Sequence, residues 1–383
     1  MTAGPLRGVR ILEIAGLGPG PFCGMMLADH GAEVIRVDKP KGTTPGASDR
    51  EARSVLNRSR RGIVLDLKTA AGVEILRDLA RGVDGLIEGF RPGVMERLGL
   101  GPEVLLNDNP KLVYGRMTGW GQTGPLASRA GHDINYLALS GVLDLLGRAE
   151  TKPTPPINLL ADFGGGGMLL AFGMVSAILH ARMGGAGQVL DCSMVEGSAL
   201  LSSMVWGFIA QGRWRGERGH NFLDTGAHFY EVYECADGRH IAIGALEPGF
   251  YAELRRVLNL TDDADFDAQS DESGWSALKV KLAALFKTRT REEWCGAFAG
   301  RDACFAPVLS PLEAAVHPHN AARRSFIRVD GVVQPAPAPR WSMTPTNTPC
   351  MLKDPAQDGA ELLRELGYAE PRIAELKAAG VVG

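Results

Sequence analysis

The stretch that decides the fold is Val9-Arg10-Ile11-Leu12-Glu13-Ile14, a short apolar run with the pattern of a buried strand. The loop Gly16-Leu17-Gly18-Pro19-Gly20-Pro21 follows it, then a helix pattern from Phe22 to His30 and a second strand pattern at Val34–Val37. A strand, a helix and a strand in succession favour two parallel strands of one sheet. This opening is therefore typical of an α/β protein.

The alternation continues through the first half of the chain. Further strand patterns occupy 63–67, 85–88, 112–114 and 188–192, and helix patterns occupy 71–81, 133–146, 166–182 and 194–211. We therefore predict an α/β fold with a Rossmann-like large domain, built on a parallel sheet that helices cover on both faces.

The character of the sequence changes in its second half. A hairpin pattern over 228–246 and helix patterns at 250–258 and 276–300 predict a smaller α+β domain. We expect the large domain to comprise 1–195 and 328–383, the linkers 196–225 and 311–327, and the small domain 226–310. The last helix patterns, 358–367 and 370–379, would pack back on the large domain.

The first loop imitates a dinucleotide-binding fingerprint. Its glycines follow a strand, and Asp38 lies about 20 residues further along, as such a fingerprint requires. Pro21 takes the place of the third glycine, and Pro19 and Pro21 lack the N–H groups that would hold a pyrophosphate. We therefore interpret the loop as a tight strand-to-helix connection rather than as a nicotinamide site.

Composition limits the classes of function. The chain has 383 residues, 45% of them apolar and 22% charged, as in an ordinary globular protein. Its net charge of -3 argues against nucleic-acid binding. Six scattered cysteines without a C-x-x-C pair predict reduced thiols and no zinc site. The longest apolar runs, 168–179 and 199–210, are shorter than the ~20 residues of a membrane span. We therefore expect a cytoplasmic protein that crosses no membrane.

Four consecutive glycines, Gly164–Gly167, follow Asp162 and begin an apolar helix pattern. Glycine weakens a helix, so such a run indicates that something approaches the backbone closely. Free N–H groups at a helix start suit a developing negative charge. With Asp162 as a candidate acid/base, the segment predicts a site where a proton moves and an enolate-like oxygen is held. Taken alone, Asp162 is better explained as an N-cap.

Two further residues suit proton transfer. His132 lies at the start of the 133–146 helix pattern, where the helix dipole favours a neutral imidazole that can accept a proton. Glu247 follows a strand pattern and precedes Pro248, a favourable first residue of a helix. Each has an ordinary structural explanation by itself, and their joint occurrence with Asp162 is what favours catalysis.

Cationic residues gather around the ends of the predicted strands. The carboxyl ends of parallel strands share one edge of a sheet, where ligands usually bind, so a polyanionic ligand with phosphates fits this arrangement. Any one of these side chains has a simpler explanation as part of a solvated surface. The group comprises Arg36 and Lys39 after the second strand, Asn57–Arg61 and Lys68 around the third, and Arg91 and Arg97 after the fourth.

Longer motifs carry a resemblance to a known family over nearly the whole chain. They are Gly18–Cys23, Leu27–Asp29, Val64–Lys68, Gly119–Gly124, Gly131–Tyr136, Asn158–Gly166, Met194–Gly197 and Gly244–Pro248. In these motifs the chain resembles the alpha-methylacyl-CoA racemases, within the family III CoA-transferase superfamily. This resemblance implies an isomerase of lipid and fatty acid metabolism.

The resemblance implies 1,1-proton transfer at the carbon alpha to a thioester, through an enolate. His132 and Asp162 would be the two acid/bases, one on each face of that carbon, and Glu247 would orient His132. The backbone N–H of Asp162 would hold the enolate oxygen, and Tyr230 would support the site. The chemistry agrees, because so weak an acid needs a positioned base and a stabilised oxyanion.

The resemblance also implies an interlocked homodimer, whose site forms where the large domain of one chain meets the small domain of the other, with Glu247 from the partner. CoA is part of the substrate, and no metal or other cofactor is implied. Lys39 stands where relatives often carry arginine, which keeps the charge but loses bidentate phosphate contact. With Arg36 of the basic group, the expected CoA-binding residues are Lys39, Leu65, Asp66, Leu67, Lys68, Arg91, Arg97, Gly131, His132, Asp133, Ile134, Asn135 and Tyr136.

Two other functions stay open. A CoA-transferase of the same fold would use Asp162 as a nucleophile and form an acyl anhydride with its substrate. Asp162 alone does not distinguish the two reactions, whereas the pair of His132 and Glu247 is required by the racemase only. The other alternative is a module that binds acyl-CoA without catalysis. The sequence leaves the acyl chain of the substrate undefined.

Overall fold

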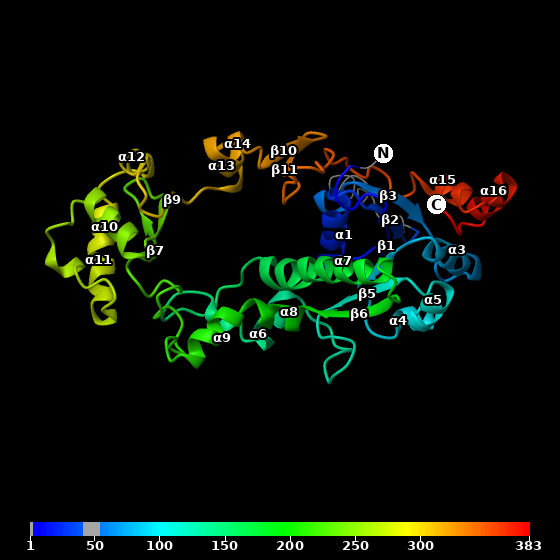
Figure 1. Cartoon of the computed structure of the whole chain (residues 1–383), viewed down its shortest axis with the longest axis horizontal. Coiled ribbons are helices and arrows are strands. Elements are labelled where there is room, and N and C mark those ends of the chain that lie inside the picture. Colours follow the sequence, from blue (N-terminus) through cyan, green and yellow to red (C-terminus); the bar gives the residue numbers. More distant parts are fainter. Residues whose placement is uncertain (1–2, 41–53) are drawn as a thin grey trace. The chain divides into compact units, whose positions relative to one another are not determined.

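The structure is a computed structural model of the chain, and it describes residues 3–40 and 54–383. It contains a six-stranded parallel sheet with the strand order β3-β2-β1-β4-β5-β6 (Figure 1). The strands are β1 (Arg10–Ile14), β2 (Glu33–Asp38), β3 (Arg60–Val64), β4 (Gly85–Glu88), β5 (Val113–Thr118) and β6 (Gln188–Ser193). The sheet confirms the predicted α/β class with its Rossmann-like large part.

Helices cover both faces of this sheet. Side chains of β1 alternate, so Leu12 and Ile14 enter one core with α3 (Ala70–Arg81), α4 (Val94–Arg97), α5 (Pro102–Asp108), α15 (Gly359–Glu365) and α16 (Glu370–Ala378). Ile11 and Glu13 point to the opposite face, which α1 (Pro19–Asp29) and α7 (Leu169–Arg182) cover. Period-two alternation of this kind follows from the pleat of a strand. Helices α15 and α16, at the end of the chain, thus pack in the same core as strand β1, at its beginning.

A buried ionic network fixes α1 on the sheet. The Glu13 carboxylate is fully buried and accepts hydrogen bonds from Arg36 at 2.8 Å and from Arg60 at 2.9 Å. Arg60 also donates to the carbonyl oxygen of Pro21, in the first turn of α1. A side chain at Gly24 would overlap this ion pair, so glycine lets the helix approach it. Removing one partner would leave a buried charge unpaired, which is costly.

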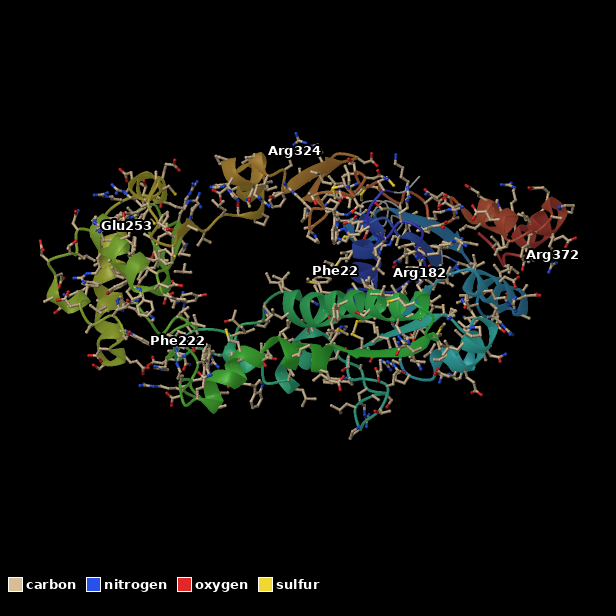
Figure 2. All side chains as sticks on the ribbon, viewed as in Figure 1. Phe22, Arg182, Phe222, Glu253, Arg324 and Arg372 are labelled. Atoms are coloured by element: carbon tan, nitrogen blue, oxygen red, sulfur yellow. The ribbon has the colours of Figure 1, made fainter. Side chains whose placement is uncertain are left out.

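The glycine run lies inside a helix rather than at its start. A π-helix, Leu159–Met168, begins before Asp162 and continues directly into α7. A Cβ on Gly165 would lie 2.7 Å from the backbone of Gly197, and one on Gly167 would lie 2.7 Å from the carbonyl oxygen of Pro19. The expected close approach is therefore made by protein backbone, from α8 (Met194–Leu201) and α1. Phe22 of α1 (Figure 2) packs on Phe163, with ring centroids 5.0 Å apart.

The combined helical segment Leu159–Arg182 is long and apolar enough to cross a membrane by length and composition alone. Its mean hydropathy is 1.5, and 44% of the window is buried inside the protein. Met174 lies against Gly85 and Gly115 of the sheet, and Leu190 lies against Gly173. A helix that covers a parallel sheet must be apolar on that side, so this packing accounts for much of the hydropathy.

A second compact unit contains the predicted hairpin. Strands β7 (Tyr230–Glu234), β8 (His240–Gly244) and β9 (Phe305–Pro307) form an antiparallel sheet. Helices α10 (Pro248–Val257), α11 (Trp275–Phe286) and α12 (Arg291–Ala297) pack on it through an aromatic core that includes Phe286 and Trp294. The helix expected over 276–300 is two helices, because Thr290 caps a new start and its N–H bonds to Glu293 at 2.7 Å.

The chain divides into unit 1, which comprises Met1–Ser140, Pro156–Ser202 and Ala322–Gly383, and unit 2, which comprises Gly141–Pro155 and Ser203–Ala321. The predicted boundaries place 141–155 in the large domain instead. Arg148 forms an ion pair with Glu231 at 2.6 Å, and Arg218 donates to the carbonyl oxygen of Asp144. These contacts attach the segment to unit 2.

The remaining helices and strands are divided between the two units. Unit 1 also holds α6 (Asp133–Leu139) and the hairpin of β10 (Phe326–Val329) and β11 (Val332–Pro335). The long helix expected over 194–211 is interrupted at Ser202, and its second half, α9 (Ser203–Ala210), falls in unit 2. Unit 2 also contains α13 (Pro311–Val316), and α14 (Pro318–Ala322) lies at its boundary.

Candidate active site

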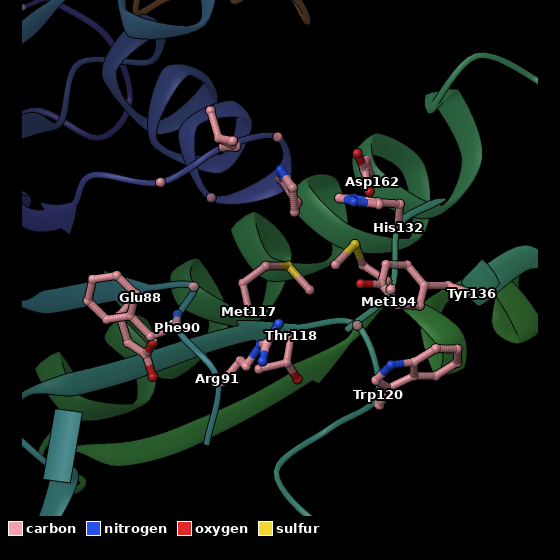
Figure 3. Close-up of a pocket in the computed structure, with 18 of the residues that line it drawn as sticks. Glu88, Phe90, Arg91, Met117, Thr118, Trp120, His132, Tyr136, Asp162 and Met194 are labelled. Carbon is pink, nitrogen blue, oxygen red and sulfur yellow. Dashed lines mark hydrogen bonds between the residues drawn. The ribbon is translucent and has the colours of Figure 1, made fainter. Parts of the chain in front are cut away.

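A pocket of about 360 Å³ opens at the carboxyl ends of β1, β4 and β5 in unit 1 (Figure 3). Strands β1 and β4 are neighbours, and from them the chain order runs outward in opposite directions. Ligands of open α/β sheets bind at such a switch point. Its walls are formed by the 16–21 loop and by residues 87–92 and 117–120 at the ends of β4 and β5. Ala127, residues 129–132, Tyr136, Asp162 and Met194 complete the lining.

Asp162 projects into this pocket from the first turn of the π-helix. Its Oδ2 accepts a hydrogen bond from the side-chain amide of Asn158 at 2.7 Å. Burial raises the pKa of Asp162, and the negative charge of Asp133 adds to the rise, whereas the bond from Asn158 and the charge of His132 oppose it. A carboxyl group with a raised pKa is a better proton donor near neutrality than an ordinary aspartic acid.

His132 is the N-cap residue of α6 and lines the same pocket. Its backbone is extended, and its N–H donates to the side-chain oxygen of Asn135 at 3.0 Å, which fixes the start of the helix. The side chain is exposed. Figure 3 places the His132 ring beside the Asp162 carboxylate at one wall of the pocket. The structure therefore brings the two proposed acid/bases together within one unit.

Tyr136 and Trp120 form the aromatic wall next to His132. Their rings meet edge to face with centroids 4.8 Å apart. A side chain at Gly119 or Gly131 would overlap the Tyr136 ring, so these glycines leave room for it. Burial, together with the charge of Asp162, raises the pKa of Tyr136 to about 12. The phenol is therefore protonated at neutral pH and is a hydrogen-bond donor.

Four of the expected CoA-binding residues line the pocket, namely Arg91, Gly131, His132 and Tyr136. Two others have buried side chains with different partners. The Arg36 guanidinium is committed to Glu13 at 2.8 Å and to Asp38 at 2.9 Å. The Asp133 carboxylate accepts the N–H groups of Ala161 and Asp162. Neither side chain is placed to receive a phosphate in this structure.

The other expected CoA-binding residues lie outside the lining of this pocket. Lys39 and Lys68 are exposed near the ends of β2 and β3, and Arg97 is exposed at the end of α4. Leu65 is fully buried, and its N–H donates to the carbonyl oxygen of Asp38. Leu67, Ile134 and Asn135 are partly or largely exposed, and Leu67 packs beside the core. The Asp66 carboxylate accepts the N–H of Lys68 at 3.0 Å.

Glu247 and Tyr230 belong to unit 2. Glu247 is exposed and forms the N-cap of α10, where its carbonyl oxygen accepts the N–H of Tyr251 at 3.0 Å. Tyr230 begins β7 and is half-buried beside the core of that unit. Each residue thus has a defined local place within unit 2, whereas His132 and Asp162 are placed within unit 1.

Several residues of the pocket had no predicted role. Arg129 adds a second cation to the lining beside Arg91. Glu88 is fully buried, and it accepts the N–H of Phe90 at 2.7 Å and a bond from Arg116 at 2.9 Å, which shapes the segment that carries Arg91. A carboxylate at the end of an apolar strand was the available signal for Glu88. Gly18 has a positive φ of 68°, and a Cβ there would lie 3.2 Å from Asp162 Oδ2.

Among the residues that the structure describes, no group of three or more His, Cys, Asp or Glu side chains is arranged to hold a metal ion. The pocket instead combines an imidazole, a carboxyl group of raised pKa, a neutral phenol and two guanidinium groups. Such a set can move protons next to a bound anion.

Fold and pocket together define an α/β protein with an acid/base site at the switch point of its parallel sheet. The chain belongs to CoA-transferase family III, whose family model matches residues 6–359. It is 48% identical over 381 residues to the alpha-methylacyl-CoA racemase of Mus musculus, covering 98% of this chain and 97% of that protein. The alpha-methylacyl-CoA racemase of Homo sapiens is 45% identical over 380 residues, with the same coverage.

A solved structure agrees with the family assignment. The chain resembles the crystal structure of a CAIB/BAIF family protein from Brucella suis, with a TM-score of 0.79 and 27% sequence identity. The similarity covers 95% of this chain and 100% of that one. Both units of the fold are therefore shared with a member of the family.

Proposed function

We propose that this protein is an isomerase that interconverts the (R)- and (S)-forms of 2-methylacyl-CoA thioesters. The observation that carries the proposal is the placement of His132 and Asp162 side by side in one pocket, with the pKa of the carboxyl group raised. Two racemases that match nearly the full length of the chain, at 48% and 45% identity, support the same reaction.

The reaction needs one proton removed from the alpha carbon and one returned to its opposite face. One of His132 and Asp162 takes the proton and leaves an enolate, and the other gives a proton to the other face, so that no net charge changes. The thioester alpha proton is a weak acid, so each step depends on a positioned base and a stabilised oxygen. Burial and the charge of Asp133 raise the pKa of Asp162, which favours its role as proton donor when His132 is the base.

Stabilisation of the enolate oxygen needs a donor other than the one implied by the family resemblance. The N–H of Asp162 donates to the Asp133 carboxylate at 2.8 Å. The Tyr136 hydroxyl faces the pocket and remains protonated, because its pKa is about 12. We assign it as one donor to the oxygen. Arg91 and Arg129, on the same pocket, would hold phosphate groups of CoA, and Lys39, Lys68 and Arg97 remain proposed contacts along the sheet edge.

We also propose that the active protein is an interlocked homodimer, in which the partner supplies Glu247 to orient His132. An apolar stripe on the π-helix and α7, which is exposed among the residues that the structure describes, supports this proposal. Its residues recur every three or four positions and are 37% to 79% exposed in the single chain. Exposed apolar patches often mark sites of interaction with another protein. This α7 stripe comprises Met168, Phe172, Val175, Leu179 and Met183. A cytoplasmic location and a role in fatty acid metabolism remain proposals.

Solvent exchange tests the reaction directly. The wild-type protein, incubated with a single enantiomer of a 2-methylacyl-CoA in heavy water, should incorporate deuterium at the alpha carbon and produce the other enantiomer. His132→Ala should reduce exchange by about a hundredfold to ten-thousandfold while the protein stays folded, because a positioned acid/base contributes an effect of that order. His319→Ala, which alters a histidine outside the pocket, is the control.

The alternative, a family III CoA-transferase, predicts the opposite results in these assays. If Asp162 is a nucleophile, CoA passes to an added free acid through an acyl anhydride, and no alpha deuterium appears. That result, or near-normal exchange in the folded His132→Ala variant, contradicts the racemase proposal. A folded protein that binds acyl-CoA but catalyses neither reaction would indicate a binding module instead. NMR of the thioester in heavy water distinguishes these outcomes.

A further inference from the structure

One buried carboxylate connects the two segments that carry the proposed acid/bases. Asp133 directly follows His132 in the chain and is the first residue of α6. Its side chain is 3% exposed, and its Oδ1 accepts the N–H of Ala161 at 2.9 Å and the N–H of Asp162 at 2.8 Å. Among the described residues it forms no salt bridge, so these two amide groups are its principal partners.

We propose that Asp133 is a positioning residue of the active site, which fixes the first turn of the π-helix against the start of α6 and so holds Asp162 at a fixed distance from His132. This inference rests on the proposed racemase function. It gives Asp133 a role different from the expected contact with CoA, since the side chain is buried away from the ligand space.

The π-helix needs such a partner because its own start supplies no cap. The first N–H groups of any helix lack partners within that helix. Asn158 precedes the π-helix in the left-handed conformation, and its side chain makes no cap bond and donates to Asp162 Oδ2 instead. A π-helix of ten residues is uncommon and found mostly at functional sites. The Asp133 carboxylate satisfies two of the free donors with charge-assisted hydrogen bonds, which are the stronger kind.

Asp133 also affects the electrostatics of Asp162. The charged or titratable groups that face Asp162 are His132 and Asp133 from the start of α6, and Tyr136 one turn later. Gly18 of the neighbouring loop contributes no charge. The negative charge of Asp133 raises the pKa of Asp162, in addition to the effect of burial. One residue therefore both places the carboxyl group and favours its protonated form.

Two substitutions separate these effects. Asp133→Asn keeps an oxygen that accepts both N–H groups but removes the charge, and Asp133→Ala removes both. We expect kcat for exchange to fall roughly tenfold in the first variant and roughly a hundredfold in the second, with KM nearly unchanged. In Asp133→Asn the acid limb of the pH profile of kcat/KM should also move to lower pH, because the pKa of Asp162 falls. A merely structural role would not move that limb.

Asp358→Asn is the matched control. The Asp358 carboxylate also accepts a backbone N–H, from Gly62 at 2.8 Å, and lies outside the pocket. This variant should keep both kcat and the pH profile within about twofold of wild type. Equal losses in Asp133→Asn and Asp358→Asn, or an unchanged rate and pH profile in Asp133→Asn, would overturn the positioning role.

Hydrogen exchange keeps the proposal testable if a variant does not fold or if the racemase function fails. In the wild-type protein the amide hydrogens of 161–162 should exchange slowly, as measured by mass spectrometry of peptides that span this segment. Fast exchange there would contradict the proposal even in a fully active enzyme. Conversely, slow exchange that speeds up in Asp133→Ala would support the positioning role even if the wild-type enzyme moves no alpha proton, which would refute only the proposed function.

Discussion

At the scale of single residues, burial decides what each ionisable group can do. Desolvation raises the pKa of Asp162, and burial keeps the Tyr136 phenol protonated, while His132 stays exposed at the helix start. Asp162 is thereby suited to donate a proton and Tyr136 to donate a hydrogen bond, while His132 is accessible to act as the base. The same physical effect acts in unit 2, where it bears on stability rather than on catalysis.

His228 should make the protein sensitive to acid. It is fully buried, its Nε2 lies 2.7 Å from the Tyr251 hydroxyl, and burial lowers its pKa to about 4. The unfolded chain binds a proton below about pH 6.5, whereas the folded state resists it until about pH 4. Stability should therefore be complete above pH 6.5 and should fall by up to about 3 kcal/mol as the pH drops to 4. Urea unfolding of unit 2 across this pH range measures the loss.

A neutral replacement provides the control for this effect. His228→Gln keeps a polar group towards Tyr251 but does not titrate, so its stability should depend less on pH between 6.5 and 4 than that of the wild type. His220→Gln, at an exposed histidine, should keep the wild-type slope. Equal slopes in wild type and His228→Gln would show that other groups cause the acid sensitivity.

The sequence identified residues more readily than their partners. His132 and Asp162 were candidates because their residue types and motifs suit proton transfer, and the structure places both on one pocket. The long-range partners of Asp133 and Arg36 were not predictable, because Ala161 and Glu13 lie 28 and 23 residues away from them in the chain. Charge suggested a ligand contact for Arg36 and the family resemblance suggested one for Asp133, whereas burial gives both side chains internal contacts.

At the scale of elements, backbone contact between helices fixes the segment that carries Asp162. Apolar runs and regular alternation were sufficient to predict the parallel strands, because the burial of a strand is evident from its own residues. The π-helix was not predictable in this way. Its wide first turn depends on the carboxylate from α6, and its glycines pack on α8 and α1, so long-range contacts decide its form. The expected start at 166 therefore missed the turn that matters for the site.

Gly197→Ala should loosen this packing. A Cβ at residue 197 would overlap the carbonyl oxygen of Gly165. Backbone atoms cannot relieve such an overlap by a change of side-chain rotamer. We expect a loss of about 2 to 4 kcal/mol in the free energy of unfolding, since overpacking of backbone is among the more damaging changes. Exchange activity should fall as well, because a displaced π-helix moves Asp162. Chemical denaturation and the deuterium assay measure the two effects.

The equivalent change at Gly296 is the control for that prediction. Gly296 lies within α12, and a Cβ there would meet nothing within 4 Å. Replacement by alanine should be neutral or should stabilise the protein by up to about 1 kcal/mol, because alanine favours the helix. If Gly197→Ala were as harmless as Gly296→Ala, the close contact between α8 and the π-helix would not be a constraint.

At the scale of the whole molecule, the proposed chemistry is divided between two units. His132 and Asp162 belong to unit 1, and Glu247 belongs to unit 2. The α7 stripe leaves an apolar surface on unit 1 that a second copy of the chain would cover. The sequence predicted a Rossmann-like large domain and a smaller α+β domain in one chain. It does not indicate which copy of the chain supplies Glu247, because that depends on assembly rather than on local sequence pattern.

Mixed dimers test whether the partner supplies Glu247. His132→Ala and Glu247→Ala are each expected to be inactive as homodimers. If the site combines unit 1 of one chain with unit 2 of the other, a dimer with one chain of each variant contains one site with both residues intact. Random pairing after co-expression should then restore about a quarter of the wild-type exchange rate. If native mass spectrometry detects the mixed dimers and no activity returns, Glu247 acts within its own chain, because every chain then lacks one of the two residues.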